Sequence, residues 1–219
     1  MKVTASTRCV KIQRPPVSTE TTSPRRSYQK RARATKEHET RLRILEAALA
    51  LHGTLGPSRT TISAIAERAG VRRATVYRHF PDERALFLGC SGLSSERNPP
   101  PDPALWAAIA DPAERLEAAL DPIYEWYERI EPLLTAVLRD VDAMPIIAEL
   151  QAGRLAYLAA IEDGLAAGWG VRGTAAKRLR ATIGLALDFL SWRALHLRGL
   201  RRADAIAVMS SAVRAAAAP

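Results

Sequence analysis

Apolar side chains recur along most of this chain at the three- and four-residue spacing of α-helices. The first such pattern begins near Glu37 and ends either at Gly53 or at Gly56 and Pro57, since Gly and Pro commonly close a helix. Two short helical segments follow at about 61–68 and 72–78, and another begins near Asp82. No segment alternates convincingly between apolar and polar residues, so the pattern predicts an all-α protein.

A clear helix start opens the second half of the chain. Asp111 has the side chain of an N-cap, Pro112 suits the first helical position, and Glu114 is the acid of a capping box. Pro122 and Pro132 should each kink or restart the helix that follows. Three further helices are expected, over residues 145–169, 174–200 and 203–217.

Composition divides the chain into a head and a body joined by a linker. The first residues mix Ser, Thr, Pro, Lys and Arg with almost no large apolar side chains, so they should be disordered. A stretch rich in Ser, Gly and Pro separates the two helical regions. The predicted parts are a disordered basic arm over 1–35, a head over 36–90, a linker over 91–110 and a helical body over 111–219.

The positive charge is concentrated near the start of the chain. The net charge is +9, and residues 1–43 carry all of it, with twelve Lys or Arg against three Glu. Residues 44–219 are neutral overall, with twenty basic and twenty acidic residues. A basic arm on a neutral body suggests a polyanionic partner, although a solvated tail without a specific partner has the same composition.

The stretch from Thr61 to Phe80 has the pattern of a helix-turn-helix. A first short helix has one apolar face and a threonine that can cap its start, and Gly70 stands where a tight turn needs positive φ. Two short helices joined in this way present the second one to the major groove of DNA. The residues expected to pack the motif are Ile65, Ala66, Gly70, Val71, Val76 and Phe80.

The second helix of this motif carries the polar face expected to contact DNA. Arginine can donate two hydrogen bonds to guanine, and the methyl group of threonine can contact thymine. Tyr77 and His79 suit phosphate oxygens better, which fix the register without reading the sequence. A basic solvated face on a helical hairpin is the alternative. The predicted DNA-contacting residues are Thr61, Arg72, Arg73, Ala74, Thr75, Tyr77, Arg78, His79 and Arg84.

This region resembles the tetracycline-repressor (TetR) family over about 45 residues. The matching elements are Arg43–Ala48, Gly56, Thr60–Thr61, Ile65–Ala66, Ala69–Val71, Thr75–Tyr77, His79–Phe80 and Leu86–Phe87. The resemblance implies an all-helical homodimer, with a DNA-binding head and a body that binds a ligand and forms the dimer. It also favours repression over activation, with release from a palindromic operator by a small effector.

Three positions depart from the pattern of that family. His52 stands where the family usually has Phe, and Arg72 stands where Ser or Thr usually caps the recognition helix. Glu83 stands where a phosphate-binding Lys is common, and Arg84 follows one place later. The last departure weakens one expected phosphate contact, and the other two leave the motif intact.

Large side chains of the body mark a candidate pocket for a small apolar or aromatic effector. Pockets are mostly apolar with a few placed polar groups, although an aromatic cluster is more often plain core. Asp188 is the one acid within an apolar stretch, and it either anchors a polar ligand atom or pairs with an arginine. The candidate ligand-binding residues are Tyr124, Trp126, Tyr127, Leu133, Met144, Tyr157, Asp188 and Trp192.

The last two expected helices are apolar on more than one side, so more than one neighbour must cover them. Two such helices from each of two chains would close a four-helix interface, unless they form core within one chain. The candidate dimer residues are Leu179, Ile183, Leu190, Ala194, Leu197, Ile206, Met209 and Val213.

Other kinds of chemistry have little support in the sequence. The four histidines and two cysteines lie at no metal-ligand or catalytic spacing, and no Gly-rich phosphate loop is present, so we expect no enzyme activity, metal or cofactor. No apolar run reaches the roughly 18 residues of a membrane span, and no secretory signal opens the chain, so we expect the cytoplasm and no membrane partner.

Two other functions fit the same pattern. One is a ligand-independent regulator or an activator of the same fold. The other is a helical small-molecule-binding protein whose basic arm binds lipid or nucleic acid.

Overall fold

A computed structural model of the protein describes residues 24–218 and divides the chain into two units, residues 1–39 and 40–219. The described residues form ten α-helices and one 3-10 turn and contain no strand, which confirms the all-α prediction. The elements are α1 (Pro24–Thr54), η1 (Pro57–Arg59), α2 (Ile62–Arg68), α3 (Arg73–His79), α4 (Glu83–Arg97), α5 (Ala104–Ala107), α6 (Pro112–Arg139), α7 (Pro145–Ala166), α8 (Gly173–Leu187), α9 (Phe189–His196) and α10 (Arg202–Ala217).

The described part of the first unit is the start of α1. Its side chains from Tyr28 to Glu39 are exposed. The prediction of disorder through residue 35 is wrong for residues 24–35, which are helical. Ala, Arg, Lys and Gln have high helix propensity, and extending a helix adds a hydrogen bond per residue without a new nucleus. The predicted arm over residues 1–23 lies outside the described residues.

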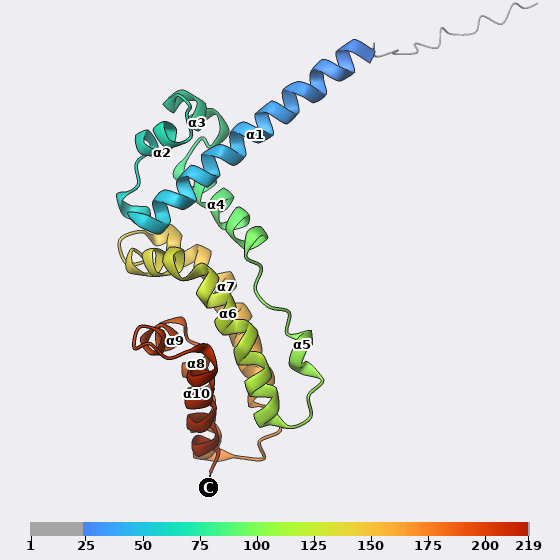
Figure 1. Cartoon of the computed structure of the whole chain (residues 1–219), viewed down its shortest axis with the longest axis vertical. Helices are drawn as coiled ribbons and strands as arrows, with labels where there is room; N and C mark the ends of the chain where they lie inside the picture. The colour runs from blue at the N-terminus through green and yellow to red at the C-terminus, as the bar shows by residue number, and fades with distance from the viewer. Residues whose placement is uncertain (1–23, 219) are drawn as a thin grey trace, which may run out of the picture. The chain divides into compact units, whose positions relative to one another are not determined.

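In the second unit, the end of α1 packs with α2, α3 and α4 around a small apolar core (Figure 1). Ile44 and Ala48 of α1 are completely buried there, together with Val76 of α3. Gly89 allows α4 to approach α1, because a Cβ at this position would lie 2.8 Å from a methyl carbon of Leu45. The apolar side chains predicted to pack the helix-turn-helix belong to this core, together with residues of α1 and α4. Within it, Ile65, Ala66, Val76 and Phe80 are buried and Val71 is half-buried.

Helix α4 is longer than its sequence suggests. The linker predicted over residues 91–110 begins too early, because α4 continues through Gly92 and two serines to Arg97. Cys90 and Leu93 are buried along this stretch. Their packing stabilises the helix against the low helix propensity of Gly and Ser.

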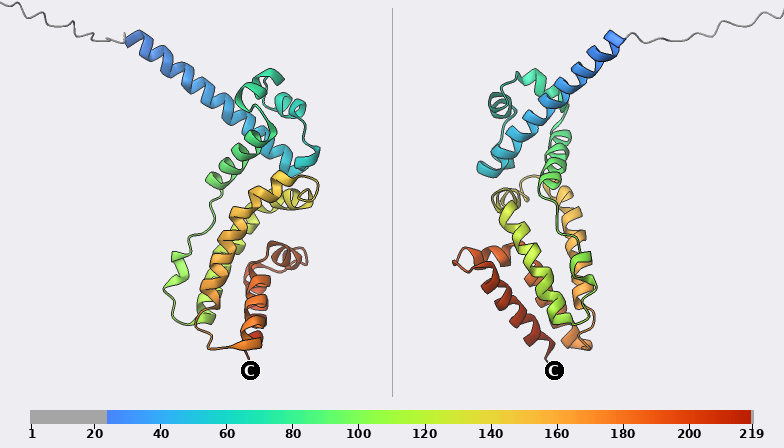
Figure 2. Two further views of the ribbon diagram at one scale, coloured as in Figure 1. Left: turned by 180° about the vertical axis from the view of Figure 1, so that it is seen from behind. Right: turned by 45° about the vertical axis from the view of Figure 1, so that its right-hand side comes forward.

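The rest of the second unit is built around α6, which contacts α5, α7, α8, α9 and α10. Figure 2 shows α8 and α10 side by side, in orange and red. Helix α6 runs unbroken from Pro112 to Arg139, so the predicted restart at Pro122 or Pro132 does not occur. Its buried face includes Leu116, Ile123 and Leu134, and this packing outweighs the backbone hydrogen bonds that the two prolines cannot donate.

The helix predicted over residues 174–200 is instead two helices, divided at Asp188. Helix α8 ends at Leu187, and the Asp188 carboxylate caps α9 by accepting a 2.7 Å hydrogen bond from the Ser191 amide. The last carbonyls of α8 accept hydrogen bonds from two tyrosines of α6. The Tyr124 hydroxyl donates to the Ala186 carbonyl at 2.9 Å, and that of Tyr127 donates to the Leu187 carbonyl at 2.5 Å.

Candidate functional site

Helix α3 presents an exposed basic face. Arg72, Arg73 and Arg78 are exposed, and no carboxylate among the described residues forms an ion pair with them. Tyr77 is 46% exposed, while its neighbour Val76 is completely buried. Of the other residues predicted to contact DNA on this helix, Ala74 is exposed and Thr75 and His79 are half-buried. The structure therefore collects these residues on and beside one accessible surface.

The turn between α2 and α3 has the local geometry that the sequence predicts. The Thr61 hydroxyl oxygen accepts a hydrogen bond from the Ala64 amide at 3.2 Å and so caps α2. Gly70 has φ of 64°, a conformation that other residues rarely adopt. The Val71 amide then donates to the Ala66 carbonyl at 2.9 Å and closes the turn. Thr61 is thus engaged in capping, and its hydroxyl is already partnered.

A residue that sequence reasoning missed holds the end of α3. Arg41 of α1 donates a 3.1 Å hydrogen bond to the His79 carbonyl, and its guanidinium lies 4.3 Å from the centre of the Phe80 ring. A cation above an aromatic face is attracted to it, so this contact ties α1 to the end of α3. The 38-residue separation of Arg41 and His79 explains why no local pattern indicated the contact.

The start of α3 lacks a side-chain cap, because Arg72 at the N-cap position makes no capping hydrogen bond. Its backbone, with φ of −79° and ψ of 148°, has the extended conformation that a capping residue adopts. Arg72→Ser should therefore raise the free energy of unfolding by about 1 kcal/mol. Urea unfolding would measure the change. Arg73→Ser, one residue inside the helix, is the matched control, and an equal gain there would contradict the capping explanation.

Arg84, the last residue predicted to contact DNA, is at the start of α4. It forms an ion pair with Glu149 of α7, and both side chains are about half exposed. Asp82 caps α4 by accepting a 2.7 Å hydrogen bond from the Ala85 amide. A phosphate contact by Arg84, as predicted, would require this ion pair to open.

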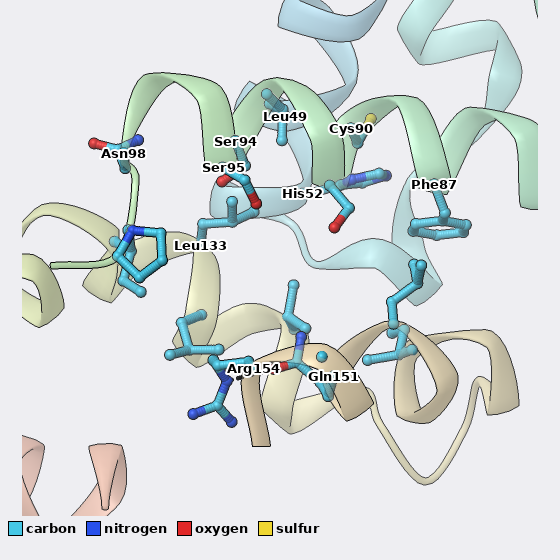
Figure 3. Close-up of a pocket in the computed structure, with 18 of the residues that line it drawn as sticks. Leu49, His52, Phe87, Cys90, Ser94, Ser95, Asn98, Leu133, Gln151 and Arg154 are labelled. Carbon is cyan, nitrogen blue, oxygen red and sulfur yellow. Dashed lines mark hydrogen bonds between the residues drawn. The ribbon is translucent and has the colours of Figure 1, made fainter. Parts of the chain in front are cut away.

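A cavity of about 370 Å³ lies between α1, α4, α6 and α7 of the second unit (Figure 3). Three residues predicted to bind a ligand line it, namely Trp126, Leu133 and Tyr157. Most of the wall is apolar, as expected for a small-molecule site. The lining residues that the sequence did not indicate include Leu49, Phe87, Ile130, Val137, Ile147 and Leu150.

The other residues predicted to bind a ligand do not line this cavity. Tyr124, Tyr127 and Trp192 are buried in the core of the body, where their rings pack against one another. These three aromatic residues therefore belong to the core. The hydroxyls of the two tyrosines are used there, because they donate hydrogen bonds to the carbonyls at the end of α8. Met144 precedes α7, and Asp188 caps α9.

His52 is a buried wall residue of the cavity and stacks on Phe87, with ring centres 5.0 Å apart and planes 14° apart. Burial lowers the pKa of His52 from 6.5 to about 4, although the nearby carboxylate of Asp140 opposes the shift. Burial also raises the pKa of the Cys90 thiol to about 12, so this wall residue is a neutral thiol. The sequence showed that His52 departs from the family pattern, but it did not indicate that this residue lines a cavity.

The end of α6 is fastened to the segment that precedes α2. The Asp140 carboxylate accepts hydrogen bonds from the Ser58 amide at 2.9 Å and from the Ser58 hydroxyl at 2.8 Å. Arg139 donates to Asp140 at 2.9 Å and to the Leu55 carbonyl at 2.9 Å. The Arg139 hydrogen bond, followed by those from Ser58, lowers the pKa of Asp140 to about 2, despite the opposing effect of burial. We call Leu55, Ser58, Arg139 and Asp140 the α6 clasp.

The residues predicted to form a dimer are divided between core and surface. Leu179, Ile183 and Val213 are buried within the chain, so they contribute to its own core. Leu190 and Leu197 of α9 are 55% and 63% exposed. Ala194, Ile206 and Met209 are half-buried, and Leu185 and Val208 add exposed apolar surface nearby in the sequence.

Within residues 24–218, no helix combines the length and apolar character needed to cross a membrane. In the same part of the chain, no group of three or more His, Cys, Asp or Glu side chains is arranged to hold a metal ion.

Residues 44–90 match the sequence profile described as "Bacterial regulatory proteins, tetR family". The repressor KstR of Rhodococcus jostii RHA1 is 34% identical over 108 residues, which are 47% of this chain and 47% of KstR. The regulator AcrR of Shigella flexneri is 47% identical over 58 residues, which are 26% of this chain and 27% of AcrR. The chain thus spans about half or less of the length of these curated relatives.

The likeness to solved structures extends over most of the chain. A TetR-like transcriptional regulator from Rhodococcus sp. RHA1 superimposes with a TM-score of 0.59 at 17% identity. The match covers 80% of this chain and 93% of that protein. At this identity the comparison shows a shared fold for the head and the helical body.

Proposed function

We propose that this chain, which belongs to the tetR family of bacterial regulatory proteins, is a sequence-specific DNA-binding transcriptional repressor. The exposed basic face of α3 is the observation that carries the proposal. The face is held rigidly by the Gly70 turn and by the Arg41 contacts to the end of α3. Arg73 and Thr75 are assigned to base edges, and Arg72, Tyr77, Arg78 and His79 to bases or phosphates.

The proposed active form is a homodimer. Two recognition helices about 34–36 Å apart would meet successive major grooves on one side of a palindromic operator. The exposed apolar residues Leu185, Leu190, Leu197 and Val208 supply surface that a second copy would cover. Sedimentation equilibrium should give the mass of a dimer at the concentrations that bind DNA. A monomer under those conditions would contradict this part of the proposal.

The cavity is the proposed site of an effector that releases the repressor. One of its walls is α4, which shares an apolar core with α3. Another wall is α6, whose end is bound to Ser58 through the α6 clasp. A ligand that favours another placement of α4 or of the clasp would change the separation of the two recognition helices. Its effect on DNA affinity equals its difference in affinity for the two states.

The test begins with selection of duplexes from a random pool by the full chain, followed by titration of the selected operator and of random DNA. Arg73→Ala with Thr75→Ala should reduce operator affinity roughly 10- to 100-fold, because bidentate arginine contacts discriminate by about 1–3 kcal/mol. Binding to random DNA should change much less. Arg129→Ala, which removes an exposed arginine of α6, is the matched control.

The outcomes separate the candidate functions. An unchanged ratio of operator to random affinity in the double variant would mean that these residues do not read bases. Failure to select any duplex at moderate ionic strength would overturn the DNA-binding proposal. Deletion of residues 1–35 should leave operator selection intact, whereas a lipid- or nucleic-acid-binding arm on a small-molecule-binding protein would lose all polyanion binding. Because its proposed partner is DNA, the repressor is placed in the cytoplasm.

A further inference from the structure

The cavity described above has polar groups on two of its walls (Figure 3). Ser91, Ser94 and Ser95 of α4 and Asn98 just after it lie on one wall, and none of these side chains has a hydrogen-bond partner among the described residues. Gln151 and Arg154 of α7 lie on another wall. Ser91, Ser94 and Asn98 are half-buried and Ser95 is exposed, so these groups have hydrogen-bonding capacity for a bound molecule.

Arg154 is the only wall residue that carries a charge at neutral pH. His52 is the other ionisable base, and burial keeps it neutral above about pH 4. The Nε of Arg154 donates a 2.7 Å hydrogen bond to the Gln151 side-chain oxygen. That contact fixes the direction of the guanidinium, and its other two nitrogens form no hydrogen bond with the described residues.

The positive charge of Arg154 is incompletely balanced by the protein. Within the described residues, no carboxylate lies at ion-pair distance from it, and Asp188 acts on it only from further away. Burial lowers the pKa of the Arg154 guanidinium, since desolvation disfavours the charged form. A half-buried cation of this kind is stabilised when an anion joins it, and the planar guanidinium matches the two oxygens of a carboxylate.

We infer that the cavity binds an apolar carboxylic acid, with its carboxylate on Arg154 and its hydrocarbon body against Trp126, Ile130, Leu133 and Phe87. The inference rests on the proposed function, because it names the chemical class of the effector that would occupy the proposed effector site. The apolar wall supplies most of the affinity by removing hydrocarbon from water. The guanidinium selects the acid over neutral molecules of the same size.

The test compares acids with neutral analogues of equal length. Hexanoate, decanoate, hexadecanoate and 4-phenylbutyrate are titrated into the full chain by calorimetry, each beside the corresponding primary alcohol. At least one acid should bind roughly 10- to 100-fold more tightly than its alcohol, as expected for a charge-assisted pair out of water. Arg154→Gln should abolish this preference and leave binding of the alcohol unchanged, while Arg154→Lys should retain part of it.

Arg129→Gln is the control, since it removes an exposed arginine of α6 outside the cavity. Circular dichroism and thermal unfolding would establish that each variant is folded. Equal binding of acid and alcohol, no binding of any acid, or a preference that survives in Arg154→Gln would each overturn the inference. Operator affinity is measured on the same samples. If the wild-type chain binds no operator, the proposed function has failed, whatever the acids do.

Discussion

When the pH is lowered from 8 to 5, the free energy of unfolding of His52→Phe should fall by about 2 kcal/mol less than that of the wild-type chain. The pKa of His52 is about 4 in the folded state and 6.5 when unfolded. Between these values the unfolded chain binds more protons, so folding stability rises with pH across the window and is lost as pH falls from 6.5 toward 4. Phenylalanine keeps the stacking on Phe87 and cannot take up a proton.

Urea unfolding of both proteins at pH 8 and pH 5 would measure the difference. Asp140 does not contribute within this window, because its folded pKa of about 2 lies below its ordinary 3.8, and its stabilisation is lost only below about pH 4. His196→Phe, which removes an exposed imidazole, is the control and should keep the wild-type dependence. If His52→Phe lost as much stability at pH 5 as the wild type, the buried neutral imidazole would not be the cause.

Gly56→Ala should lower the free energy of unfolding by about 3 kcal/mol, because it adds a collision to backbone strain. Gly56 has φ of 96°. A Cβ at this position would lie 1.8 Å from Nη2 of Arg139 and 2.6 Å from Oδ2 of Asp140, so both side chains of the α6 clasp must move. Their movement leaves the buried Asp140 carboxylate and the Ser58 amide poorly paired.

Gly170→Ala is the matched control for this substitution. Gly170 has φ of 69°, and a Cβ there would have no atom within 4 Å, so only the backbone strain of about 1–2 kcal/mol applies. Unfolding in urea would compare the two variants with the wild type. Equal losses in both would show that the α6 clasp contributes nothing measurable to stability. In the proposed repressor, Gly56→Ala should also weaken the response of operator affinity to any effector, because it disturbs the link between α6 and the head.

The helix-turn-helix could be predicted closely because its determinants are local. The Thr61 cap, the Gly70 turn and the apolar positions of α2 and α3 lie within about twenty residues and act through backbone preference and helical periodicity. The exposed basic face follows directly, since burying Val76 and Phe80 turns the arginines outward. The same local signals placed the start of α6 at Asp111, whose carboxylate accepts hydrogen bonds from the Ala113 and Glu114 amides.

The body was predicted less well because distant residues decide its details. At the break between α8 and α9, the carbonyls that end α8 accept hydrogen bonds from Tyr124 and Tyr127, about sixty residues earlier in the chain. Aromatic residues alone cannot show whether they will line a cavity or complete a core. Trp126 and Tyr157 line the cavity, whereas the neighbouring Tyr127 does not.

The helical class, the helix-turn-helix and its exposed basic face could all be predicted before the fold was known, because each depends on interactions between near neighbours along the chain. The place of the cavity, the arginine that lines it and the contact of Asp140 with Ser58 across 82 residues could not. Those features require side chains from separate helices to meet. Such meetings depend on how whole helices pack, and no local pattern encodes them.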